Sequence, residues 1–216
     1  MITIFAGAAA VCAGLAIVAE WNERRHASFY LLKPLTTFLI ALMAAQAAPG
    51  DLRTLVLCAL ALSLLGDICL MFSGNAWFMA GLSSFLLAHL AFIPALLHGV
   101  TSPTLPLWSI GLVLWGVGFF AWLLPKTGPL KIAVVIYGAV LMAMALSAIA
   151  RWQVFPNAAS AWGLVGALLF VVSDSSLSVR QFNGRYRGAQ ALILSTYWSA
   201  IGCIAYASIL MAAAPA

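Results

Sequence analysis

The feature that most constrains this chain is a succession of apolar stretches, each about as long as a helix that crosses the hydrocarbon core of a bilayer, roughly 20 residues. We count eight such stretches, separated by short linkers. Their approximate ranges are 2–20, 29–48, 54–72, 76–97, 105–124, 130–150, 159–179 and 188–212. Apolar and polar residues do not alternate as a transmembrane barrel requires. The sequence therefore predicts an all-α, polytopic membrane bundle of about eight transmembrane helices.

The composition supports an integral membrane protein and excludes a soluble one. Of the 216 residues, 65% are hydrophobic and 7% are charged, and the mean hydropathy is +1.09. Soluble domains carry about 25% charged residues. We therefore expect one integral-membrane domain over residues 1–216, without a separate soluble part. The net charge of +5 forms no dense basic patch on a polar surface, so a nucleic-acid partner is not expected.

The positive charges predict the orientation in the membrane. The linkers after odd-numbered stretches hold seven Lys and Arg residues, and those after even-numbered stretches hold two. The first group is Arg24, Arg25, Lys126, Lys131, Arg180, Arg185 and Arg187, and the second is Arg53 and Arg151. The positive-inside rule then places the odd linkers in the cytoplasm and both termini outside. Short linkers in an Ala-rich chain are typical of a bacterial inner-membrane protein.

Two aspartates inside the apolar stretches are the first candidates for function. A carboxylate at membrane depth costs several kcal/mol unless it is paired, neutralised or hydrated. At 1.5 Å per residue, Asp67 and Asp174 are both predicted roughly 7–9 Å inside the cytoplasmic boundary. Lys33 and Gln190 enter at the same level, at the starts of the second and eighth stretches. We therefore expect these four polar residues, from four helices, to converge.

Three further residues are candidate support or substrate-binding groups. Ser63 precedes Asp67 by four residues and so shares its helix face, and Tyr186 borders the cytoplasmic level. His89 lies about thirteen residues into the fourth stretch, roughly 20 Å deep and well below the aspartates. A zinc site needs three or four protein ligands, and this difference in depth argues against one. We expect no metal and no organic cofactor.

Two acids at one depth favour general acid–base chemistry, with one carboxyl protonated while its partner stays ionised. Other interpretations remain open at this point. The aspartates could pair with Lys33 only to hold helices together, or relay protons or cations in a transporter. An intramembrane aspartyl protease also uses two aspartates. Its Pro-Ala-Leu motif follows both of them, however, whereas Pro94-Ala95-Leu96 falls between the two here.

The polar positions stand in five short motifs that cover most of the chain. In order they are Lys33-Pro34, Ser63-x-x-Gly66-Asp67-x-x-Leu70-Met71, Gly81-x-x-x-Phe85-x-x-Ala88-His89, Gly166-Ala167-Leu168-x-Phe170-x-x-Ser173-Asp174-x-x-Leu177 and Tyr186-x-x-Ala189-Gln190. This ordered set resembles the YhhN-like lysoplasmalogenase family of multi-pass membrane proteins.

The resemblance implies a hydrolase for the vinyl ether bond of 1-alkenyl-lysoglycerophospholipids, a lysoplasmalogenase. Its products are a fatty aldehyde and glycerophosphocholine or glycerophosphoethanolamine. The resemblance also implies that Asp67 and Asp174 carry the chemistry, with a lysophospholipid drawn from the surrounding membrane lipids as substrate. The alternative that we keep is a proton-coupled small-molecule transporter, although no repeat of two related halves is visible.

Overall fold

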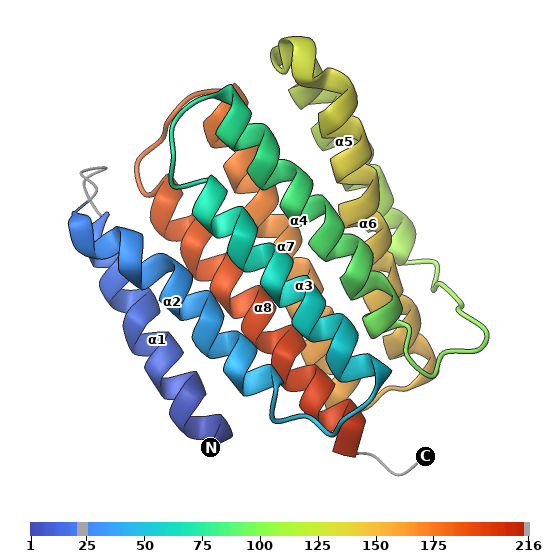
Figure 1. Ribbon diagram of the computed structural model, residues 1–216. Helices are drawn as coiled ribbons and strands as arrows, with labels where there is room; N and C mark the ends of the chain where they lie inside the picture. Colours follow the sequence, from blue (N-terminus) through green and yellow to red (C-terminus); the bar gives the residue numbers. More distant parts are fainter. Residues whose placement is uncertain (21–25, 214–216) are drawn as a thin grey trace.

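The computed structural model describes residues 1–20 and 26–213 (Figure 1). Arg24 and Arg25, used above for the orientation, lie outside these residues. The described part of the chain contains eight α-helices, two short 3-10 turns (η1 and η2) and no strand. The elements are α1 (Ile2–Ala19), α2 (Ala27–Ala44), α3 (Asp51–Cys69), α4 (Asn75–Leu96), α5 (Ser109–Leu123), η1 (Leu124–Lys126), η2 (Gly128–Leu130), α6 (Lys131–Val154), α7 (Ala158–Phe182) and α8 (Ala189–Ala213).

Each of these helices is long and apolar enough to cross a membrane, α5 together with η1. The predicted polytopic helical bundle is therefore confirmed, and the differences are confined to helix ends. The fifth helix begins at Ser109 rather than near residue 105, because Pro103 and Pro106 lack the backbone N–H that a continuing helix uses. The Ser109 hydroxyl instead donates to the Pro106 carbonyl oxygen at 2.7 Å.

A tight turn connects α3 and α4. Gly74 ends it with a φ of +117°, a conformation that residues with a Cβ rarely adopt. α4 then begins at Asn75 and runs back beside α3. The chain thus forms a helical hairpin with only a few residues in the connection, which places the end of α3 next to the start of α4.

The helices pack as successive antiparallel hairpins, α1 with α2, α3 with α4 and α7 with α8. α8 also contacts α1, α2 and α3, so it runs through the middle of the bundle, whereas α5 lies at the edge (Figure 1). Small residues allow the closest approach. A Cβ on Gly166 of α7 would lie 2.7 Å from the Ala200 carbonyl oxygen of α8. This close contact agrees with the small-residue packing expected between helices in lipid.

The start of α1 and the end of α8 lie at one end of the bundle, and the α3–α4 and α7–α8 turns lie at the other (Figure 1). Several charges predicted in linkers belong to helix ends instead. Arg53 is in the first turn of α3, and Arg151 is in the last turn of α6. Lys131 is the first residue of α6, and Arg180 is in the last turn of α7. The start of α3 and the ends of α6 and α7 extend into the predicted linkers, because charged residues are tolerated in the terminal turns.

Candidate functional site

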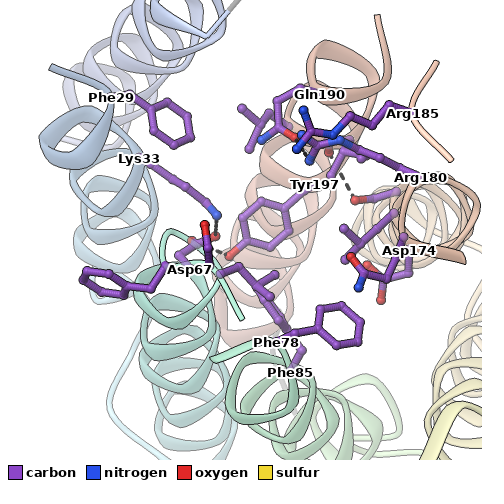
Figure 2. Close-up of a pocket in the computed structure, with 18 of the residues that line it drawn as sticks. Phe29, Lys33, Asp67, Phe78, Phe85, Asp174, Arg180, Arg185, Gln190 and Tyr197 are labelled. Carbon is purple, nitrogen blue, oxygen red and sulfur yellow. Dashed lines mark hydrogen bonds and ion pairs between the residues drawn. The ribbon is translucent and has the colours of Figure 1, made fainter. Parts of the chain in front are cut away.

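A cavity of about 300 Å³ opens near the end of the bundle that carries the α3–α4 and α7–α8 turns. We call it the polar cavity. Lys33 of α2, Asp67 of α3, Asp174 of α7 and Gln190 of α8 all line it, so the predicted convergence of these four residues is observed. Figure 2 shows Asp67 on one side of the cavity and Asp174 on the other. The helical hairpins bring the two acids together although 107 positions separate them in the sequence, 67 against 174.

Asp67 is surrounded by hydrogen-bond donors and a cation. The Lys33 ammonium nitrogen lies 3.4 Å from Asp67 Oδ1. The Thr37 hydroxyl donates to Oδ2 at 2.6 Å, and the Tyr197 hydroxyl donates to the same oxygen at 2.8 Å. Asp67 is 1% exposed and Lys33 is 5% exposed, so the pair is withdrawn from bulk solvent. An ionised carboxylate is an acceptor only, and this arrangement supplies donors to both of its oxygens.

Thr37 and Tyr197 were not among the predicted site residues, although the sequence contains a signal for each. Thr37 follows Lys33 by four residues, and Tyr197 follows Gln190 by seven, so each shares a helix face with a predicted residue. A second contact supports Thr37, because the indole Nε1 of Trp198 donates to its hydroxyl oxygen at 3.2 Å. The Trp198–Thr37–Asp67 chain therefore links α8 and α2 to the carboxyl group on α3.

Asp174 has a different set of neighbours. The Tyr137 hydroxyl of α6 donates to Asp174 Oδ2 at 2.5 Å. His89 Nε2 of α4 lies 3.7 Å from the same oxygen. His89 Nδ1 lies 2.6 Å from the Phe85 carbonyl oxygen, which can only accept, so Nδ1 carries a hydrogen and Nε2 faces the carboxyl group. Tyr137 was not among the predicted site residues, because α6 is apolar on all sides and its sequence gives no indication of its inward face.

The predicted depth of His89 is wrong. We expected it well below both aspartates, whereas its ring is within 4 Å of Asp174. Part of the reason is that α7 continues to Phe182, three residues beyond the predicted end at 179, so Asp174 lies eight residues, about 12 Å, from the end of its helix. Asp67 lies only two residues from the end of α3 at Cys69. The acids therefore reach one cavity from different positions along their helices.

Arginine side chains line the polar cavity toward the α7–α8 turn. Arg180 and Arg185 are both among its lining residues. Arg180 Nη1 donates to the Gln190 side-chain oxygen at 2.5 Å, which places Gln190 beside a cation rather than beside either aspartate (Figure 2). Guanidinium groups bind phosphate oxygens with matching planar geometry. This part of the cavity is suited to an anionic head group.

The remaining predicted residues stand outside the polar cavity. Ser63, His89 and Tyr186 are not among the described residues that line it. Ser63 is fully buried one turn before Asp67. The Tyr186 hydroxyl lies 3.5 Å from the Ser176 carbonyl oxygen, so Tyr186 joins the α7–α8 turn to α7. Ser63 and Tyr186 therefore contact the helix framework and are not placed to touch a molecule in the cavity.

The acids do not form a metal site with neighbouring ligands. Within residues 1–20 and 26–213, no three His, Cys, Asp or Glu side chains come together in a group that could hold a metal ion. His89 lies beside Asp174, whereas the carboxyl group of Asp67 contacts Lys33, Thr37 and Tyr197. The donor set around the cavity is thus one of separate carboxyl groups with hydroxyl, ammonium and imidazole neighbours.

A model of the YhhN family matches residues 28–208 of this chain. The chain belongs to the YhhN family. All the described residues that line the polar cavity fall within the matched region, as do Thr37, His89, Tyr137 and Trp198. α1 lies outside the match and contributes no residue to the cavity. The shared part of the family therefore contains the whole candidate site.

Relatives named lysoplasmalogenase come from bacteria and mammals. A lysoplasmalogenase of Mycobacterium bovis is 32% identical over 180 residues, which cover 78% of this chain and 66% of the relative. Lysoplasmalogenase TMEM86B of Sus scrofa is 30% identical over 166 residues, with 77% and 66% covered. The human TMEM86B is 32% identical over 153 residues, with 70% and 62% covered. This chain spans about two thirds of the length of these relatives. No solved structure matches it significantly.

Proposed function

We propose that the protein is a lysoplasmalogenase, which hydrolyses the vinyl ether bond of 1-alkenyl-lysoglycerophospholipids to a fatty aldehyde and a glycerophospho-alcohol. The observation that carries the proposal is the pair of carboxyl groups on the polar cavity, each with a different set of neighbours. The names of the bacterial and mammalian relatives support the same activity. The head group of the substrate determines whether the second product is glycerophosphocholine or glycerophosphoethanolamine.

Asp67 is the ionised member of the pair in this proposal. The Lys33 ammonium group and the hydroxyl groups of Thr37 and Tyr197 all favour the charged form of its carboxyl group. Lys33 also offsets the cost of burying that charge. An anion held in this way stabilises a cation that forms beside it and can accept a proton from water.

Asp174 is the proton donor. The Tyr137 hydroxyl donates to its carboxyl group, and the His89 ring lies beside the same oxygen. A buried carboxyl group beside a hydroxyl and an imidazole is suited to hold a proton and release it to the substrate. His89 Nε2 is 3.7 Å from Oδ2 and supports the return of a proton to Asp174 after turnover.

The chemistry needs an acid and a nearby anion. Asp174 adds a proton to C2 of the alkenyl group, and the resulting positive charge is shared between C1 and the ether oxygen. Water attacks C1 and gives its proton to Asp67. The product of this addition is a hemiacetal. The hemiacetal then breaks its C1–O bond, and its hydroxyl proton ends on the glycerol oxygen. One proton has been added and one released, so a proton must pass from Asp67 back to Asp174 before the next cycle.

The location of the cavity suits a lysolipid. Arg180 and Arg185 are positioned for the phosphate group, and Asp174 lies deeper than Arg180 along α7, since it is six residues further from the helix end. A lysolipid likewise has its charged head group at the interface and its ether linkage just below it. We propose the cytoplasmic side of a bacterial inner membrane for this end, because the Lys and Arg residues concentrate there.

The test is aldehyde release from a 1-alkenyl-lysophospholipid by the purified protein in detergent. We expect activity in the wild type and a loss of at least about a hundredfold in Asp67→Asn and Asp174→Asn, since each amide keeps the shape and removes the acid or base. A saturated 1-alkyl-lysophospholipid, which has no double bond to protonate, is the substrate control. A folded wild type without aldehyde release refutes the proposal, and proton-driven solute flux in vesicles would then favour the transporter.

A further inference from the structure

The polar cavity does not end at Asp174. A second, mainly apolar space lies between α4, α5, α6 and α7, and we call it the apolar slot. Three residues line both spaces, namely Phe78, Asp174 and Leu177. The slot is narrow, about 40 Å³ in volume, and Tyr137 lies on its wall. Asp174 therefore stands at the junction of a charged cavity and a hydrocarbon-like one.

The apolar slot continues toward the lipid-facing side of the bundle. A groove of about 440 Å³ runs between α5 and α6, and its lining is almost wholly apolar. This α5–α6 groove shares Gly116, Phe120, Gly138 and Met142 with the slot. A volume of a few hundred Å³ is in the range of small-ligand sites. The three spaces therefore lie in series, adjacent through shared lining residues, from the arginines, past Asp174, to the outside of the bundle.

Phe120 lines both the slot and the groove. Its ring lies over Gly138, where a Cβ would be 1.7 Å from the ring atom Cζ, so the missing side chain provides the space that the ring fills. The helix that carries Phe120 is loosely held, since Ser109, Gly116 and Leu123 are its buried residues. A small outward shift of α5, or a rotation of the Phe120 ring, opens the path.

We propose that the hydrocarbon chain of the lysolipid enters sideways between α5 and α6 and displaces Phe120, so that its alkenyl end reaches Asp174 from the apolar slot. The inference rests on the proposed function. It also agrees with the order of atoms in the substrate, because C2, which receives the proton, is the alkenyl carbon next to the tail. The head group then extends toward Arg180 and Arg185.

A larger groove elsewhere provides the rival route. It measures about 770 Å³ and lies between α1, α2 and α8. It shares no described lining residue with the polar cavity, and Trp198, bonded to Thr37, stands between it and Asp67. A chain in this groove is therefore separated from both acids.

The experiment compares three Gly→Leu variants on a short (octenyl) and a long (octadecenyl) 1-alkenyl-lysophospholipid. Gly116→Leu fills the junction of slot and groove, where the flexible Met142 methyl group, 2.5 Å from the new Cβ, has to shift. Gly118→Leu on the same helix meets nothing within 4 Å and is the matched control. Gly202→Leu fills the α1–α2–α8 groove.

We expect Gly116→Leu to raise KM for the long substrate by about tenfold, the size of effect that a blocked apolar subsite produces, with little change for the short one. Gly118→Leu and Gly202→Leu should keep the wild-type ratio of the two substrates. Retained turnover of the short substrate shows that Gly116→Leu is folded. An unchanged ratio in Gly116→Leu, or a shift in Gly202→Leu, overturns the route and leaves the proposed activity standing.

A second readout does not depend on turnover. A 1-alkyl-lysophospholipid with a diazirine at the end of its chain is irradiated with the intact wild-type protein, and the labelled peptides are identified. Labelling of α5 and α6 supports the proposed route even in a protein that releases no aldehyde. Labelling confined to α1 and α8 overturns it.

Discussion

The ion pair between Lys33 and Asp67 leads to a stability prediction that can be worked from its geometry. Nζ and Oδ1 lie 3.4 Å apart, and the two side chains are 7% and 2% exposed. With an effective dielectric constant of about 20, unit charges at this separation attract by about 5 kcal/mol. Lys33→Met keeps a long unbranched side chain but removes the cation, and so leaves the carboxylate buried without its partner.

We expect Lys33→Met to lower the free energy of unfolding by about 3–5 kcal/mol, the usual cost of breaking a buried pair from one side. Asp67→Asn should have a similar effect, since it leaves a buried ammonium group. Lys33→Met/Asp67→Asn has neither charge and should lie close to the wild type. Unfolding of the four proteins in one detergent then gives a coupling energy of about 6–10 kcal/mol, because the double variant lacks the costs of both single variants.

The matched control is Lys126→Met at the same end of the bundle. Its ammonium group donates to the Asn183 side-chain oxygen at 2.7 Å on the exposed surface, so the expected change is within about 0.5 kcal/mol. A coupling energy between Lys33 and Asp67 below about 0.5 kcal/mol would contradict the reasoning, because it is the value of a solvent-screened pair. Asp67 would then not be held in its ionised form by Lys33.

Three other changes test the site, the packing and the orientation. Tyr137→Phe keeps the ring and removes the hydroxyl that donates to Asp174. The loss of a hydrogen bond worth about 1.5–3 kcal/mol should lower the rate of aldehyde release by about 10–100-fold without unfolding the protein. Gly166→Leu should destabilise the bundle by about 1–3 kcal/mol in an unfolding assay, because its Cβ would lie 2.7 Å from a backbone oxygen, whereas Gly14→Leu, with nothing within 4 Å, should not. An alkaline phosphatase fused in the α4–α5 loop should be active and one fused in the α7–α8 turn inactive; the reverse result refutes the orientation.

The sequence was sufficient for the main architecture because the helices are defined by local composition. Apolar runs long enough to span a bilayer can be recognised directly in the sequence. The structure contains a helix in each of the eight predicted ranges within the described residues. The convergence of Lys33, Asp67, Asp174 and Gln190 was also predictable. In antiparallel hairpins, the ends of odd helices and the starts of even ones meet at one end of the bundle.

Only the tertiary structure decided which groups surround each carboxyl group. A hydrogen bond depends on the rotation of each helix about its axis and on shifts of a few ångströms along it. A helix that is apolar on all sides, such as α6, does not encode its rotation in its sequence pattern, so Tyr137 could not be predicted as a neighbour of Asp174. The predicted depth of His89 was wrong for the second reason, in part because three more residues in α7 place Asp174 about 4.5 Å deeper. Composition determined that two acids enter the membrane, and packing determined that one lies beside an ammonium group and the other beside an imidazole.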